Sequence, residues 1–153
     1  NYSPRRVIDF GCGSGFSDIY LAINGFTVSG YDPDIKAIRA AKYLTSVQPL
    51  DVRRRLYFSQ MSIPIGQYDL VWSSHVFEHI PEKKMDGVLK SLLSLNVPIL
   101  MSVPLGHAYD MPLHVNHWAT HEDFSHCLKE HSGVDWETWE DSANLVIKAK
   151  HGH

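Results

Sequence analysis

A glycine-rich stretch near the N-terminus constrains the fold of this chain more than any other feature. Residues 9–15 read Asp-Phe-Gly-Cys-Gly-Ser-Gly and follow the apolar pair Val7-Ile8. From Phe16 to Ile23, apolar residues then recur with the i, i+3, i+4, i+7 spacing of one helix face. The pattern predicts a strand, a tight turn whose backbone can approach a ligand closely, and a helix. The N-terminus of that helix favours a negatively charged ligand group.

The main alternative is the dinucleotide fingerprint G-x-G-x-x-G. Its third glycine would fall at position 16 or 18, where this chain has Phe16 and Asp18. A carboxylate at the end of the strand, Asp9, would also repel a phosphate. Asp9 suits a ligand that carries positive charge or amine and hydroxyl donors, so an NAD-dependent oxidoreductase is disfavoured.

A second acidic residue supports a nucleoside ligand. Residues 26–31 read as a strand, and Asp32 follows it about 20 residues beyond the glycine turn, the spacing at which an acid accepts hydrogen bonds from ribose hydroxyls. An ordinary turn aspartate before Pro33 is the alternative for this position. Asp34 is a natural N-cap for the next helix. Taken together with Asp9 and the glycine turn, Asp32 favours the nucleoside interpretation.

The pattern D-x-G-x-G-x-G resembles that of the class I S-adenosylmethionine-dependent methyltransferases. Residues 68–72 are similar to the family's "fDlV" segment, and residues 73–81 to its "vlEHi" continuation. The resemblance implies S-adenosylmethionine as cofactor, with Asp9 near its amino group, the glycine turn along it and Asp32 on its ribose. Gln60 and Met61 stand where the family commonly places an acid facing adenine, which is a departure. The expected cofactor-binding residues are Asp9, Gly11, Cys12, Gly13, Gly15, Asp32, Pro33, Gln60, Met61, Ser73 and Ser74.

Strand and helix patterns alternate along the chain and predict an α/β fold. We expect a doubly wound, mostly parallel seven-stranded sheet with a C-terminal antiparallel hairpin and helices on both faces. Residues 48–55 read as a polar linker, 104–119 as a loop, and 120–123 as a capping box with Asp in place of Glu or Gln. The further strands are expected at 56–59, 68–72, 97–103, 134–139 and 144–150.

Composition is that of an ordinary globular chain. A length of 153 residues fits a single methyltransferase domain, residues 1–153, and the start at Asn1 without a methionine suggests that an N-terminal lid segment is missing. A formal net charge of −3 gives no general attraction to nucleic acid. No apolar run approaches the ~20 residues that span a bilayer, so we expect no membrane partner. Two cysteines form no disulfide framework, which favours the cytoplasm; the oligomeric state is left open.

The cofactor would supply the reactive methyl group, and the protein must orient the acceptor. His75, just past the strand at 68–72, is the best-placed general base, with a packing role as the alternative. The chain lacks the [DN]-P-P-[FY] signature of amide and nucleobase methyltransferases after that strand. We therefore expect a small-molecule acceptor, as in the quinone-biosynthesis-like branch. A degenerate or truncated module that binds cofactor without turnover is the alternative.

Six of the ten histidines lie between His107 and His131, which raises the question of a metal. His114 and His117 fall in the expected loop, whereas His121 opens the next helix, and H-E-x-x-H is absent from the sequence. Methyl transfer from a sulfonium needs no Lewis acid. The sequence therefore predicts no metal, and a role for His117 or His114 in lining the pocket or as a local base to the acceptor.

Overall fold

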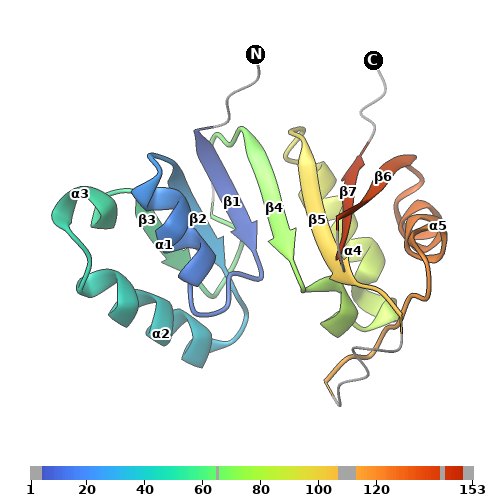
Figure 1. Cartoon of the computed structure of the whole chain (residues 1–153), viewed down its shortest axis with the longest axis horizontal. Helices are drawn as coiled ribbons and strands as arrows, with labels where there is room; N and C mark the ends of the chain where they lie inside the picture. Colours follow the sequence, from blue (N-terminus) through green and yellow to red (C-terminus); the bar gives the residue numbers. More distant parts are fainter. Residues whose placement is uncertain (1–4, 65, 107–112, 142–143, 150–153) are drawn as a thin grey trace. The chain divides into compact units, whose positions relative to one another are not determined.

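The computed structural model describes residues 5–64, 66–106, 113–141 and 144–149 (Figure 1). The chain divides into two compact units, which we call the N-terminal unit (residues 1–73) and the C-terminal unit (residues 74–153). Each unit is described by itself. The predicted α/β class is confirmed, because helices alternate with strands along the chain.

The N-terminal unit is built on parallel strands in the order β3-β2-β1-β4. These are β1 (Arg6–Phe10), β2 (Thr27–Tyr31), β3 (Leu56–Ser59) and β4 (Leu70–Ser74, whose last residue falls in the other unit). Asp9 stands opposite Gly30 on β2 and Trp72 on β4. The turns that follow β1, β2 and β3 therefore leave the sheet at the same edge, as parallel pairing requires.

Three helices connect these strands: α1 (Phe16–Ile23), α2 (Ile35–Ser46) and α3 (Leu50–Arg53). The predicted N-cap of α2 is confirmed, since a carboxylate oxygen of Asp34 accepts from the Lys36 N–H at 2.8 Å. The prediction of a linker over residues 48–55 is wrong at α3. Pro49 precedes the first turn and Val52 is buried, so burial of one apolar side chain fixes a short helix there.

The buried face of α1 also differs from the predicted apolar stripe. Its buried residues are Asp18, Ile19 and Ala22. Three members of the predicted stripe are exposed: Phe16 (78%), Tyr20 (67%) and Ile23 (58%). Helical periodicity identified the helix correctly, but the face that packs on the sheet includes an acid that a hydrophobic pattern does not count.

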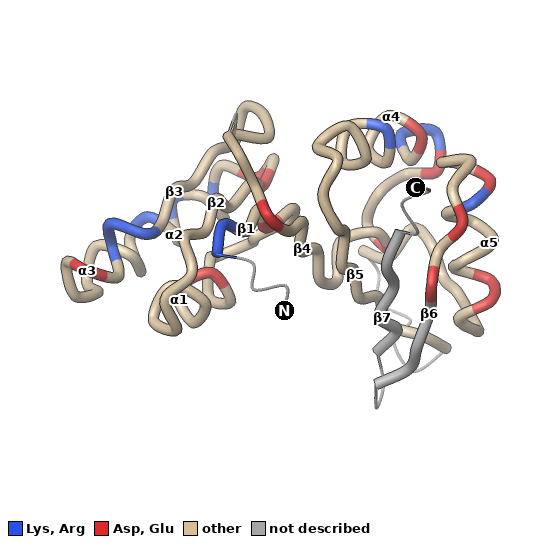
Figure 2. Tube along the Cα trace, turned by 90° about the horizontal axis from the view of Figure 1, so that it is seen from above, with Lys and Arg blue, Asp and Glu red and all other residues tan. Residues whose placement is uncertain are grey.

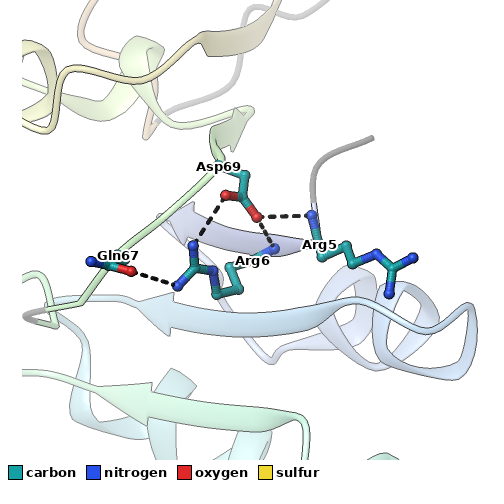
Figure 3. A network of polar contacts seen from close by, with 4 residues as sticks. All are labelled: Arg5, Arg6, Gln67 and Asp69. Atoms are coloured by element: carbon teal, nitrogen blue, oxygen red, sulfur yellow. Dashed lines mark hydrogen bonds and ion pairs between the residues drawn. The ribbon is translucent and has the colours of Figure 1, made fainter. Parts of the chain in front are cut away.

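The start of β1 is tied to the segment before β4 through Asp69 (Figure 3). One oxygen of Asp69 accepts from the backbone N–H of Arg5 (3.0 Å) and Arg6 (2.9 Å), and the other lies 3.3 Å from the Arg6 guanidinium. Gln67 accepts from the same guanidinium at 3.2 Å. These backbone donors, with Arg6, lower the pKa of Asp69. Asp69 therefore precedes the strand, which begins two residues later than predicted.

The C-terminal unit holds the single-turn helix η1 and two longer helices against an antiparallel set of strands. The elements are η1 (Phe77–His79), α4 (Glu82–Leu93), β5 (Ile99–Pro104), α5 (His121–Ser132), β6 (Trp136–Asp141) and β7 (Asn144–Ala149). β7 runs antiparallel to both neighbours, with Met101 of β5 opposite Ile147 and Trp139 of β6 opposite Val146. The prediction of a single seven-stranded sheet with helices on both faces depends on how the two units are placed, and it stays a prediction.

The start of α5 matches its predicted capping box. The Thr120 hydroxyl accepts from the Asp123 N–H at 3.2 Å, and the Asp123 carboxylate accepts from the Thr120 N–H at 3.0 Å. Gly133 ends the helix at φ 69°. Part of the predicted loop at 104–119 lies outside the described residues. Among the described helices, none has the length and apolar character that crossing a bilayer requires.

Candidate cofactor site and histidine cluster

The glycine turn between β1 and α1 folds onto the end of β2. The backbone N–H groups of Gly11 and Cys12 both donate to the Tyr31 carbonyl, at 2.7 and 3.0 Å, and the Gly15 N–H donates to the Cys12 carbonyl at 2.9 Å. Gly11, Gly13 and Gly15 all have positive φ, at 83°, 53° and 72°. The predicted turn is therefore present as a compact loop, which we call the glycine loop (residues 11–15).

Besides its positive φ, the close packing around Gly15 also requires a glycine. Gly15 is the left-handed N-cap of α1, and a Cβ built on it would lie 2.9 Å from the Ala41 Cβ and from ring atoms of Phe58. Such a contact is too short for carbon atoms, so a side chain here would displace the core under the loop. The close packing of the loop on α2 and β3 thus fixes its position.

Asp32 joins the glycine loop to the turn after β2. One carboxylate oxygen accepts from the Gly13 N–H at 3.0 Å, and the other accepts from the Asp34 N–H at 2.8 Å. Both interpretations of this residue thus have support, because Asp32 makes the local turn and also lies at the loop. Each oxygen keeps a second lone pair, so the half-buried carboxylate can still accept from a ligand hydroxyl.

Asp9 is buried beside a second acid, Asp18, that sequence reasoning did not single out. Asp9 is 3% exposed, and burial raises its pKa to about 7, with a hydrogen bond to Asp18 lowering it and the charge of Asp32 raising it. Asp18 is fully buried, and burial followed by the Asp9 charge raises its pKa to about 9. Among the described residues, no donor reaches the Asp18 oxygens other than a proton shared with Asp9. The two carboxyl groups therefore titrate as a pair that retains a proton at neutral pH.

Cys12 was expected to contact the cofactor, but its side chain faces the protein interior. The thiol packs with Ile38, Ala41 and Phe58, and burial raises its pKa above the ordinary range. Its backbone N–H and carbonyl both serve the glycine loop. Cys12 therefore shapes the loop, and its thiol is not a ligand or nucleophile there.

The expected adenine-side residues lie at the neighbouring turns. Gln60 donates from its amide to the Pro33 carbonyl at 3.3 Å, and the Asp32 N–H donates to the Ser59 carbonyl at 3.2 Å. The turns after β2 and β3 are thus joined. Met61 is 88% exposed, so its side chain is available to a ligand and contributes little to the core.

Ser73 and Ser74 both have protein partners for their hydroxyls. The buried Ser73 hydroxyl donates to the Phe10 carbonyl at 2.9 Å, between β4 and β1. In the C-terminal unit, the hydroxyl of Ser74 lies 2.8 Å from that of Ser102 on β5. The two serines therefore position the ends of their strands, and any contact to a cofactor would have to share these bonds.

His75 occupies an unusual backbone conformation at the end of β4. Its φ is 55°, and its N–H donates to the Ser102 carbonyl at 2.9 Å. Non-glycine residues seldom adopt positive φ and do so mainly where the surrounding structure imposes it, often at functional sites. The half-exposed ring places Nδ1 3.5 Å from Oε1 of Glu78, which is 1% exposed.

His75, His79 and His114 lie close to Glu78, and His117 lies beside His114. His79 Nδ1 lies 3.0 Å from the Leu113 carbonyl, and the His79 and His114 rings meet edge to face with centroids 4.9 Å apart. The His114 and His117 ring centroids are 6.1 Å apart, and His117 is exposed. We call the residues His75, Glu78, His79, His114 and His117 the histidine cluster. The sequence analysis singled out His75, His114 and His117, whereas Glu78 and His79 were part of it only as the "EH" pair of residues 73–81.

Comparison with known proteins decides the family. The family described as "Methyltransferase domain" matches this chain over residues 1–149. The chain belongs to that methyltransferase family. The predicted resemblance to class I S-adenosylmethionine-dependent methyltransferases is confirmed, with S-adenosylmethionine as the cofactor of the family.

Similar proteins are larger than this methyltransferase domain. The 2-methyl-6-phytyl-1,4-hydroquinone methyltransferase of Synechocystis sp. is 32% identical over 118 residues, which cover 73% of this chain and 36% of that protein. The ubiquinone biosynthesis O-methyltransferase of Bordetella pertussis is 33% identical over 82 residues, 52% of this chain and 34% of that protein. The chain thus spans about a third of the length of these relatives.

A solved structure supports the same fold. The glycopeptide N-methyltransferase MtfA in complex with S-adenosylmethionine superposes with a TM-score of 0.76 at 13% identity, covering 97% of this chain and 88% of that one. At that identity the similarity concerns the fold alone. In this methyltransferase domain, the residues fit the cofactor on their own grounds: a buried acid at Asp9, an acceptor at Asp32, and a glycine loop joined to Asp32 by the Gly13 N–H.

Proposed function

We propose that this domain catalyses methyl transfer from S-adenosylmethionine to a small-molecule acceptor. The observation that carries the proposal is the hydrogen bond from the Gly13 N–H to the Asp32 carboxylate, next to the buried carboxyl of Asp9. This bond joins the glycine loop to Asp32, which can accept from ribose hydroxyls, and both lie near Asp9, which can accept from an amino group. A nucleoside with a cationic side chain requires these three features. The names of the relatives that methylate quinone precursors support a small molecule as the acceptor.

Each residue would contact a different part of the cofactor. Asp9 would accept from the amino group, the glycine loop would follow the chain between amino acid and ribose, and Asp32 would accept from the ribose hydroxyls. Gln60 and Met61, with Pro33, would border the adenine. When bound, the cofactor supplies a methyl group on a sulfonium, and the protein contributes mainly orientation and exclusion of water.

His75 or His117 would act on the acceptor. A hydroxyl acceptor must lose its proton as it attacks, and an imidazole that titrates near neutral pH can receive it. The main chain of His75 is held at the end of β4 by the hydrogen bond from its N–H to the Ser102 carbonyl, whereas His117 lies exposed at the edge of the histidine cluster. We expect substitution of His75 to lower turnover more than substitution of His117, because the main chain of His75 is fixed.

The test is a methyl-transfer screen with labelled S-adenosylmethionine and a panel of phenols, hydroquinones and other metabolites. For a hydroxyl acceptor that is found, His75→Ala should lower turnover by about 10²–10⁴, whereas His126→Ala, which removes an exposed side chain of α5, should not change it. An unchanged rate in His75→Ala would return His75 to a packing role. Preferred methylation of nucleic acid would reject the acceptor class. The alternative of a module without turnover predicts cofactor binding but no transfer to any member of the panel.

A further inference from the structure

We propose that Glu78, His79 and His114 form a binding site for a divalent transition-metal ion. One ligand atom from each of the three residues lies within 4.8 Å of the other two. The site uses residues some 35 positions apart, so the spacing of His114, His117 and His121 in the sequence did not reveal it. This inference concerns a site that the proposed methyl transfer does not require.

The carboxyl of Glu78 is the first observation in favour of a cation. It is 1% exposed, and neither oxygen has a hydrogen-bond donor among the described residues. Its nearest basic group in the cluster, His75 Nδ1, lies 3.5 Å from Oε1 and belongs to a ring that is 46% exposed. A buried carboxylate without donors is strongly unfavourable unless a cation compensates it.

The tautomer of His79 is the second observation. Its Nδ1 lies 3.0 Å from the Leu113 carbonyl, and a carbonyl can only accept, so Nδ1 must carry the proton. Nε2 of the neutral ring then has its lone pair directed away from this bond. Metal-binding histidines characteristically donate their other N–H to a carbonyl or carboxylate, which fixes the ring orientation. The His79 ring therefore has the arrangement of a ligand.

The loop that carries His114 is fastened to η1 by backbone contacts. The N–H groups of Val115 and Asn116 donate to the Glu78 carbonyl at 2.8 and 3.1 Å. The Asn116 side-chain amide donates to the carbonyls of Phe77 (3.0 Å) and Ile80 (2.6 Å). Together with the bond of His79 to the Leu113 carbonyl, these four hydrogen bonds hold the two segments that supply the three ligands in place before any ion binds.

The donor set indicates the kind of ion. Two imidazoles and a carboxylate suit Zn²⁺, Fe²⁺, Co²⁺ or Mn²⁺, whereas Mg²⁺ and Ca²⁺ prefer oxygen ligands throughout. Ligand bonds of about 2.0–2.2 Å require small side-chain rotations to close the cluster. Three protein ligands leave positions for water or for an oxygen of a substrate. The charge of the C-terminal unit agrees, since residues 74–153 contain eleven acidic and six basic residues, and an excess of negative charge attracts cations. Figure 2 shows acidic residues on α4, α5 and β6 of this unit.

The test uses the full chain without a histidine tag, treated with a chelator and then titrated with Zn²⁺ by calorimetry. We expect one equivalent to bind with micromolar or tighter affinity. Glu78→Gln and His114→Ala should each weaken this binding at least about tenfold. His126→Ala is the matched control, because it removes an exposed histidine of α5 outside the cluster, and it should bind as the wild type does.

A second measurement keeps the test informative if a variant is poorly behaved. Saturating Zn²⁺ should raise the thermal midpoint of the wild type by about 5–10 °C, and should leave that of Glu78→Gln unchanged. Co²⁺ should give the absorption of nitrogen and oxygen ligands without a thiolate band. Failure of the wild type to bind, a thiolate band, or equal binding by Glu78→Gln and wild type would each overturn the proposal. None of these results affects the cofactor assignment, which is measured separately.

Discussion

Two buried acids, Asp9 and Asp18, set the pH behaviour of the N-terminal unit. In the unfolded chain both ionise near pH 4, whereas in the folded protein burial raises their pKa values to about 7 and about 9. The folded state therefore holds more protons than the unfolded state between about pH 4 and pH 9, and stability must fall as pH rises through that window. The charge of Asp32 raises the pKa of Asp9 further, and the buried thiol of Cys12, whose pKa burial also raises, extends the loss of stability to pH values above the ordinary pKa of a thiol.

The first prediction follows from the direction in which stability changes with pH. The free energy of unfolding of the wild type should fall between pH 6 and pH 8, by up to about 1.4 kcal/mol per pH unit for each proton retained. Asp18→Asn keeps a neutral donor beside Asp9, so at pH 8 it should be more stable than the wild type by roughly 1–3 kcal/mol. Urea unfolding of both proteins at the two pH values is the measurement. Parallel pH profiles would show that the pair does not hold a proton.

At the scale of elements, the glycine loop contains two glycines with different requirements. Gly13 and Gly15 both have positive φ, but a Cβ at Gly13 meets no atom within 4 Å, whereas one at Gly15 meets Ala41 and Phe58 at 2.9 Å. Gly13→Ala should therefore cost about 1–2 kcal/mol of folding stability from backbone conformation alone. Gly15→Ala should cost roughly 2–5 kcal/mol, since overpacking is added. Thermal and urea unfolding compare them; equal losses would contradict the packing account.

Local patterns in the sequence predicted most elements because each carries its own signal. The glycine loop, the Asp34 N-cap and the Thr120–Asp123 capping box depend on contacts within a few residues, and all three are present. The short helix α3 and the exposed side of α1 were missed. In both cases the outcome depends on which face meets the sheet, and this packing is decided by residues distant in the sequence.

At the scale of the whole chain, the candidate sites show the same contrast: residues marked by a local pattern were predicted, and groupings that depend on distant contacts were not. Asp9 and Asp32 were predicted because parallel strands end at one edge, so strand order alone brings their turns together. The pairing of Asp18 with Asp9 depends on the rotation of α1, and the grouping of Glu78 and His79 with His114 depends on the contacts that residues 113–116 make with residues 77–80. Sequence spacing therefore located the glycine loop but not the histidine cluster.

The most direct measurement of the central claim is calorimetric binding of S-adenosylmethionine and its demethylated product to the wild type and to Asp32→Ala. Loss of hydrogen bonds to a carboxylate, each worth roughly 1.5–3 kcal/mol, should weaken binding at least about tenfold. The control Asp51→Ala removes an exposed acid from α3 and should bind as the wild type does. Circular dichroism confirms that each variant is folded. Equal binding by wild type and Asp32→Ala, or a preference for NAD, would contradict the assignment of this loop to S-adenosylmethionine.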